Sequence, residues 1–141
     1  MWLRDPIERI RSHFDSWRLG SKRVHPRAQD LFDSVHAGTC SIEQFGTHPT
    51  VANYYRWILG DIDVHELTAV GVLEKADASL ARITTVLGLS PSGELPSLNQ
   101  TKGRNDRPAL SPTARTMITD ANAADFEIYD QAVARYQAVV G

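Results

Sequence analysis

Asp5-Pro6 divides the start of this 141-residue chain into two parts of different secondary structure. Proline has no backbone N–H and a fixed φ, so it fits the first position of a helix and does not continue a strand. Asp5 is a preferred N-cap residue, and Glu8 stands where it approximates a capping box. The apolar residues 1–3 precede this signal. We therefore expect the end of a strand, a tight turn and a helix that Gly20 ends.

Apolar residues at helical spacing mark the face that this first helix buries: Ile7, Ile10, Phe14 and Trp17. Further helices are predicted near residues 28–35, 41–46 and 50–59. The last of these is rich in aromatic residues, namely Tyr54, Tyr55 and Trp57. We interpret these rings as packing surface rather than as a platform for stacking bases.

A second strand is predicted in the short apolar run 67–73, because of its length and because it contains Gly71. A helix follows, with Ala76, Leu80, Ile83 and Leu87 as its apolar positions and Gly88 as its end. A strand that leads directly into a helix is typical of α/β proteins. Residues 90–107 are predicted to form a long loop. Ser111-Pro112 then starts a long amphipathic helix, bent near residues 120–125, with Phe126, Tyr129, Val133, Tyr136 and Val140 on its apolar face.

Composition excludes several classes of protein. The net charge of −2 gives no general attraction to nucleic acid or anionic lipid, so any anion site must be local. The chain has no run approaching 18 apolar residues, and its one cysteine, Cys40, forms no internal disulfide. The five histidines have no metal-ligand spacing, so no metal is expected. We expect a soluble, cytoplasmic protein with neither a nucleic-acid partner nor a membrane span.

Arg4, Arg9 and Ser12 are candidate ligands for an anion at the first turn. Helix N-termini attract anions, and a guanidinium can donate two parallel hydrogen bonds to a phosphate. Ser12 lies about 10 Å along the helix, so a shared phosphate has to lie along its flank. Arg9, one turn before Ser12, could face the same side. The alternative is that both arginines are solvated and Ser12 is a surface hydroxyl.

The segment Leu-Arg-Asp-Pro-Ile-Glu-Arg-Ile-Arg-Ser-His-Phe, residues 3–14, resembles the 3′-phosphate-binding segment of sulfotransferases. The resemblance implies that Arg4 and Ser12 hold the 3′-phosphate of the co-substrate 3′-phosphoadenosine 5′-phosphosulfate. Residues 99–104 look like the family's Lys-Gly-Arg loop, so Lys102, Gly103 and Arg104 would close over the donor nucleotide. On its own, that motif would be a solvated basic turn. Residues 70–74 and 124–129 are similar to later family segments.

The chain departs from the family pattern at its start. The family's glycine-rich or Lys-Thr-Gly-type loop for the 5′-phosphosulfate, and normally its catalytic base, precede the 3′-phosphate segment, and neither is found here. The nearest approach to the loop, Gly20-Ser21-Lys22, follows a helix rather than a strand. The expectation is therefore one partial domain, residues 1–141: the C-terminal portion of the α/β P-loop-type sulfotransferase fold, helix-dominated, with one or two short strands.

Two short strands do not make a stable open sheet alone. Helices, a second copy of the chain through strand pairing, or a missing N-terminal segment would then cover its edges, so a homo-oligomer is one of the alternatives.

The expected function is a sulfotransferase, or the donor-binding part of one, that transfers a sulfuryl group to a hydroxyl or amine acceptor of unknown identity. One alternative is a catalytically incompetent truncated relative that acts as an interaction or nucleotide-binding module. The other is a helical binding domain unrelated to sulfate.

Overall fold

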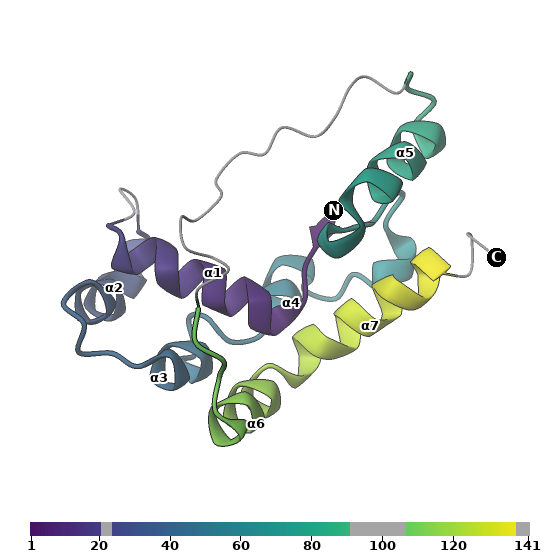
Figure 1. The fold of residues 1–141 in the computed structure, drawn as a ribbon. Coiled ribbons are helices and arrows are strands. Elements are labelled where there is room, and N and C mark those ends of the chain that lie inside the picture. The colour runs from purple at the N-terminus through teal and green to yellow at the C-terminus, as the bar shows by residue number, and fades with distance from the viewer. Residues whose placement is uncertain (21–23, 91–106, 138–141) are drawn as a thin grey trace.

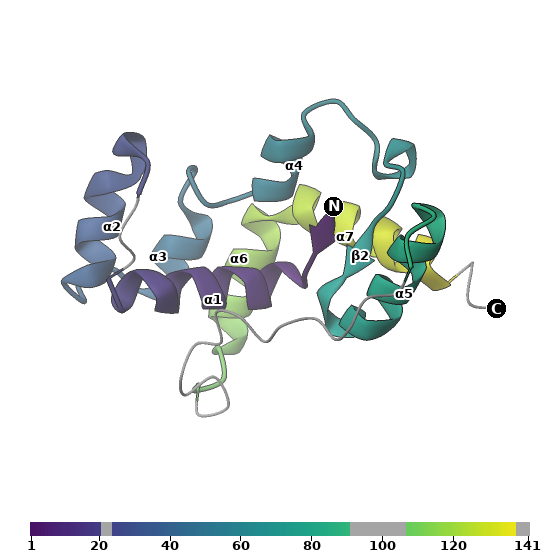
Figure 2. The same cartoon turned by 90° about the horizontal axis from the view of Figure 1, so that it is seen from above.

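The fold is dominated by helices arranged around one central helix. The computed structural model describes residues 1–20, 24–90 and 107–137. Helix α1 (Pro6–Arg18) runs through the middle of the molecule. Figures 1 and 2 both show α2 (Gln29–His36) and α3 (Ile42–Thr47) at one end and α5 (Ala76–Val86) at the other.

The remaining elements connect these two ends. Helix α4 (Tyr54–Leu59) packs against α7 (Ala123–Gln137), which runs from α6 (Pro112–Ala121) toward the end that holds α5 (Figure 2). Short 3₁₀ turns occur at Pro26–Ala28, Val64–Glu66 and Leu73–Lys75. None of the helices within the described ranges is long and apolar enough to cross a bilayer.

A small parallel sheet joins the start of the chain to its middle. Strand β1 (Trp2–Leu3) pairs with β2 (Gly71–Val72), with Trp2 opposite Gly71. A side chain at position 71 would force the Trp2 ring to move, because its Cβ would lie 2.6 Å from that ring. On the other side of β2, the buried Ser79 hydroxyl accepts from the Val72 N–H and donates to the Val72 carbonyl. The prediction of a helix-dominated chain with one or two short strands is confirmed for the residues that the structure describes.

The predicted start of α1 is confirmed, but the capping box is only half formed. Asp5 Oδ1 accepts a hydrogen bond from the Glu8 N–H at 2.9 Å. The Asp5 N–H donates to Glu74 Oε1 instead of to Glu8. Glu8 does not reach back, because three arginines engage its carboxylate, as described below.

Two apolar clusters form the core. The larger one lies between α1, α2, α3 and α6 and contains Ile7, Ile10, Phe14, Trp17, Val35, Phe45, Val51 and Ile118. The smaller one lies around the sheet, α4 and α7 and contains Leu3, Tyr55, Leu59, Val64, Val70, Ile128 and Ala132. All four apolar positions predicted for α1 are therefore buried in the first cluster.

The aromatic segment differs from its prediction. Helix α4 begins only at Tyr54, because Asn53 adopts a left-handed conformation (φ 52°) that ends the preceding turns. Tyr55 is buried, but Trp57 is 77% exposed and stacks only on the partly exposed Tyr54. The interpretation of all three rings as packing surface is wrong for Trp57.

The C-terminal region is two helices rather than one bent helix. The buried Asn122 separates α6 from α7, and its side-chain amide donates to the carbonyls of Gly46 and Ile118. Helix α7 buries Asp125, Ile128 and Ala132, a face different from the predicted one. The hydrogen bonds of Asn122 and Asp125 to other elements set this rotation, and apolar periodicity carries no information about them.

Candidate functional site

Arg4 occupies the corner between β1 and α1. The Tyr55 hydroxyl accepts from the Arg4 N–H at 2.9 Å and donates to the Arg4 carbonyl at 2.8 Å. Burial raises the pKa of Tyr55 to about 12, so this hydroxyl keeps its proton at neutral pH. The corner is therefore fixed through its backbone, and the Arg4 guanidinium reaches along α1 to lie 3.5 Å from Glu8.

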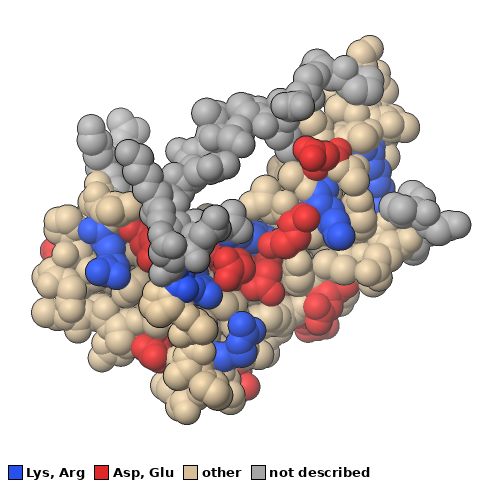
Figure 3. All heavy atoms as spheres, in the orientation of Figure 1, with Lys and Arg blue, Asp and Glu red and all other residues tan. Residues whose placement is uncertain are grey.

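Glu8 is the centre of a group of charged side chains on this face of α1. Its carboxylate lies 3.5 Å from Arg11 as well as from Arg4, and 3.9 Å from Arg107. Arg107 also pairs with Asp15, about two turns after Glu8 on α1. We call these five residues the α1 arginine face. Figure 3 shows acidic and basic side chains mixed in a band across this side of the molecule.

The α1 arginine face brings three guanidinium groups together. Among the residues that the structure describes, they form ion pairs with the carboxylates of Glu8 and Asp15. All three side chains are largely covered, with 14%, 15% and 10% of the Arg4, Arg11 and Arg107 side chains exposed. Ion pairs at such partly desolvated positions are less screened by salt than those on an open surface. The face therefore gathers partly covered cations on a chain whose net charge is negative.

Ser12 lies on the same face, one helical turn after Glu8. Arg107 contacts both Glu8 and Asp15, so its guanidinium lies alongside the turn that carries Ser12. Ser12 is partly buried, and its hydroxyl makes no hydrogen bond within the part of the chain that the structure describes. Arg4 and Ser12 therefore each stand about one turn from Glu8, on opposite sides of it. Their backbones are about 12 Å apart along the helix axis, so the long Arg4 side chain has to cross this distance to share a ligand with Ser12.

The N-terminus of α1 offers little to an anion. The Glu8 N–H donates to the Asp5 side chain, and the Arg9 N–H donates to the Asp5 carbonyl. Pro6 has no N–H. An anion on this face therefore lies along the flank of the helix, in line with what the position of Ser12 requires.

The expectation that Arg9 faces the Ser12 side is wrong. Its guanidinium turns toward α7, where it lies 3.3 Å from Asp125 and donates to the Val51 carbonyl. It also lies over the rings of Tyr54 and Tyr55, at 5.3 and 5.4 Å from their centroids. Burial lowers the pKa of Arg9, although Asp125 opposes the shift. Arg9 is a core residue that joins helices, and it is not an anion ligand.

Lys102, Gly103 and Arg104 lie outside the described residues, so their role stays a prediction. Arg107, three residues later in the sequence, is described and contacts α1. Of the α1 arginine face, only Arg4 was predicted from the sequence, and Glu8, Arg11, Asp15 and Arg107 were not. The sequence did contain an indication for Glu8, because Arg4 stands four residues before it and Arg11 three residues after it, the spacings of neighbours on a helix.

Other chemistries find little support in the described ranges. They contain no group of three or more His, Cys, Asp or Glu side chains that could hold a metal ion. Cys40 is partly buried, and burial raises the pKa of its thiol, which disfavours the reactive thiolate. What the α1 arginine face can do chemically is bind an oxyanion.

Comparison with known proteins gives no family: no family model, no curated protein and no solved structure matches this chain.

Proposed function

We propose that this chain is a sulfotransferase or the donor-binding part of one, and that its α1 arginine face holds the 3′-phosphate of 3′-phosphoadenosine 5′-phosphosulfate. The observation that carries the proposal is the arrangement of Arg4 and Ser12. Arg4 stands at the end of a parallel strand, and Ser12 lies on the same face of the following helix, with Glu8 between them.

The position of Arg4 relative to the sheet supports a nucleotide ligand. β1 leads into α1, and β2 leads through one short turn into α5, so both parallel strands have a helix at their carboxyl ends. In open α/β sheets, ligands bind outside the carboxyl ends of the strands. The proposal includes the C-terminal portion of the P-loop-type fold, with further strands completing the sheet.

The contacts of Glu8 leave Arg4 able to exchange partners. The Glu8 carboxylate lies 3.5 to 3.9 Å from the three arginines, further than the ~2.7–2.9 Å of a strong charge-assisted hydrogen bond. When Arg4 turns to a phosphate, Glu8 keeps Arg11 and Arg107. A phosphate carries more charge than a carboxylate and matches the arginine fork. We therefore expect a phosphate to compete with Glu8 for Arg4.

Lys102, Gly103 and Arg104 complete the proposed site. A glycine allows close approach of the backbone to a phosphate, and the cations on either side of it supply positive charge. The support for their participation is Arg107, which brings the chain back to α1 three residues after Arg104. Neither the acceptor nor a catalytic base is assigned. The reaction breaks the bond between the sulfuryl sulfur and the 5′-phosphate oxygen of the donor, and joins that sulfur to the acceptor oxygen or nitrogen.

Calorimetry with 3′-phosphoadenosine 5′-phosphate tests the proposal. We expect weak binding, and we expect Arg4→Ala to weaken it by about 1.5–3 kcal/mol, the value of a hydrogen bond to a charged group. Ser12→Ala should cost about 0.5–1.5 kcal/mol. Arg18→Ala is the matched control, because Arg18 is an exposed arginine on the same helix.

A second ligand separates phosphate recognition from general effects on the fold. Adenosine 5′-phosphate lacks the 3′-phosphate, so Arg4→Ala should leave its binding unchanged. The proposal is wrong if 3′-phosphoadenosine 5′-phosphate does not bind, or if it binds Arg4→Ala as well as it binds the wild type.

One observation favours a second function, that of an interaction module without sulfotransferase activity. Trp57 is 77% exposed and Ile58 is 48% exposed on α4, an apolar surface of the kind that marks protein contacts. A folded chain that transfers no sulfuryl group and sediments as a stable oligomer, which Trp57→Ser dissociates, would support this function over the first.

A further inference from the structure

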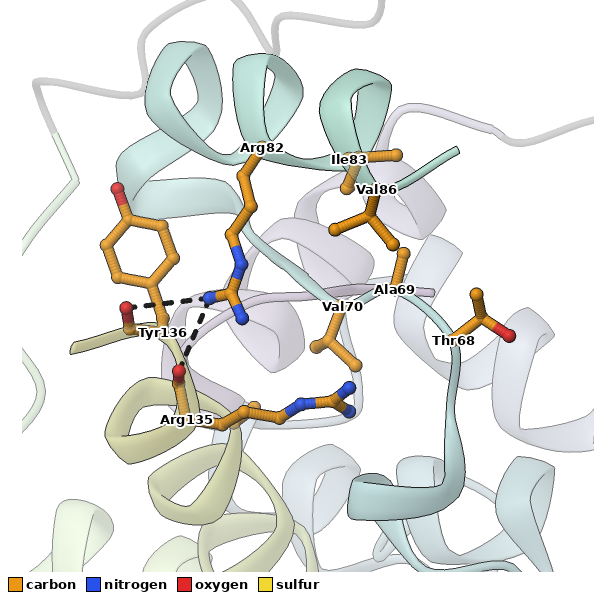
Figure 4. A pocket seen from close by; sticks show the side chains of 9 residues that line it. Thr68, Ala69, Val70, Arg82, Ile83, Val86, Arg135 and Tyr136 are labelled. Atoms are coloured by element: carbon orange, nitrogen blue, oxygen red, sulfur yellow. Dashed lines mark hydrogen bonds between the residues drawn. The ribbon is translucent and has the colours of Figure 1, made fainter. Parts of the chain in front are cut away.

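A cavity of about 250 Å³ lies between α5, α7 and the residues that lead into β2. It shares no residue with the α1 arginine face. Arg82 enters it from α5 and Arg135 from α7, and Figure 4 shows both guanidinium groups beside the same space, with Val70 and Val86 along it. The cavity therefore combines two cations with an apolar wall.

These two arginines differ from the other partly buried arginines of the described chain. Arg4, Arg9, Arg11 and Arg107 each have a carboxylate within 4.0 Å. Arg82 and Arg135 have none among the residues that the structure describes. A partly desolvated cation without a counter-ion is unfavourable, and two of them beside one cavity attract an anion.

The backbone contacts of both side chains use only part of their donors. Arg82 Nη1 donates to the carbonyls of Arg135 and Tyr136 at the end of α7, at 3.3 and 3.5 Å. Arg135 Nη1 donates to the Val64 carbonyl at 2.8 Å. A guanidinium has five N–H donors, so Nε and Nη2 of each group remain for a ligand. The backbone contacts hold both groups in place, and little freedom has to be lost on binding.

The apolar walls of the cavity favour a ligand with an apolar part beside its negative charge. Val70, Ile83 and Val86 line the cavity, and Val86 is 51% exposed, so a ligand that covers it removes apolar surface from water. The volume lies below the ~300–1,000 Å³ of pockets for drug-sized molecules. We propose that this cavity is a binding site for a small organic carboxylate with a short aliphatic tail, its carboxylate held by Arg82 and Arg135 and its tail against Val70, Ile83 and Val86.

Titration of the isotope-labelled chain with hexanoate, followed by NMR, tests the site. We expect saturable shifts of the amide signals of residues 68–70 and 132–136 and of the Nε–H signals of both arginines. Hexanamide has the same tail without the charge, and inorganic phosphate has charge without the tail. Hexanamide should bind at least tenfold more weakly, since a hydrogen bond to a charged group contributes about that factor. Phosphate should also bind more weakly than hexanoate, because it has no tail to cover the apolar wall.

Substitutions of the two arginines test whether their guanidinium groups bind the carboxylate. Arg82→Gln and Arg135→Gln should each reduce hexanoate affinity about tenfold or more, whereas Arg115→Gln, at an exposed arginine of α6, should not change it. If a cavity variant fails to fold, the comparison of hexanoate with hexanamide on the wild type still decides. Equal binding of these two ligands, or hexanoate shifts elsewhere in the chain, would overturn the proposal.

Discussion

Arg9 and Asp125 join the two ends of the chain inside the protein, with Arg9 Nη2 and Asp125 Oδ2 3.3 Å apart and Asp125 fully buried. The other Asp125 oxygen accepts from the N–H groups of Tyr55 and Arg56 at the start of α4. Burial raises the pKa of Asp125, while those N–H groups and the charge of Arg9 oppose the shift. One carboxylate thus positions α1, α4 and α7 together.

Replacing Arg9 with methionine should strongly destabilise the fold. Arg9→Met leaves the Asp125 charge buried without its cation, which typically costs about 3–5 kcal/mol. Urea unfolding at neutral pH measures the change. Arg115→Met, at an exposed position, should stay within about 0.5 kcal/mol of the wild type.

The double variant Arg9→Met, Asp125→Asn separates charge from packing. Asparagine keeps an oxygen for the N–H groups of Tyr55 and Arg56 but removes the charge. We expect the double variant to be more stable than Arg9→Met alone. If the two substitutions instead add, the coupling between these residues is not electrostatic.

His13 should make the fold sensitive to mild acid. It packs edge-on against the rings of Trp17 and Phe45, and burial, with a smaller contribution from the charge of Arg9, lowers its pKa from 6.5 to about 4. The unfolded chain therefore takes up a proton below pH 6.5 that the fold excludes. Stability from this group is fully present above pH 6.5 and is lost as the pH falls toward 4. Between pH 7 and 5 the loss is about 2 kcal/mol.

Unfolding experiments at both pH values check this expectation. His13→Phe keeps an aromatic ring without the proton site, so its loss of stability between pH 7 and 5 should be smaller by about that amount. His65→Phe, at an exposed histidine, should lose as much stability as the wild type. Parallel pH curves for the wild type and His13→Phe would contradict the assignment.

The sequence predicts the local structure of this protein better than its polar contacts. Asp5-Pro6 specifies the start of α1, and Gly88 follows the end of α5, because caps and breakers act over a few residues. The direction of Arg9 was not predictable, because Asp125 lies 116 residues away in the chain. Helical spacing permits Arg9 to face either flank, and only the tertiary contact decides.

Part of the candidate site could be predicted from the sequence, and part of it could not. Arg4 and Ser12 could be assigned from spacing and resemblance, since only eight residues of the chain separate them. Arg107 joins them from a distant part of the chain, and no pattern indicates that it pairs with Glu8 and Asp15. The cavity with Arg82 and Arg135 was also not predictable from the sequence, because its two cations come from different helices.

Ser79 should be important for the small sheet. Its buried hydroxyl satisfies both the N–H and the carbonyl of Val72. Ser79→Ala leaves these groups buried without a partner, at a cost of about 1–3 kcal/mol in the free energy of unfolding. Thr85→Ser, which keeps the hydroxyl of an exposed residue on the same helix, should change little. Hydrogen exchange at the Val72 amide gives a local readout, and unchanged protection in Ser79→Ala would contradict this role.

Gly46→Ala tests whether packing outweighs helix propensity at the contact between α3 and α6. Alanine is favoured over glycine within a helix by about 1 kcal/mol, so propensity alone predicts a gain in stability. The new Cβ, however, would lie 2.9 Å from Ile118 Cγ1 and 3.1 Å from Ile10 Cγ2, in a fully buried part of the core. Overpacking of this kind costs about 1–3 kcal/mol, and we expect a net loss in thermal unfolding. Ile118→Val removes only Cδ1, which would lie 3.2 Å from the new Cβ, and keeps the nearer γ position. The double variant should therefore be slightly more stable than the two single changes predict by addition. A gain in stability for Gly46→Ala alone would mean that α3 and α6 lie further apart than described here.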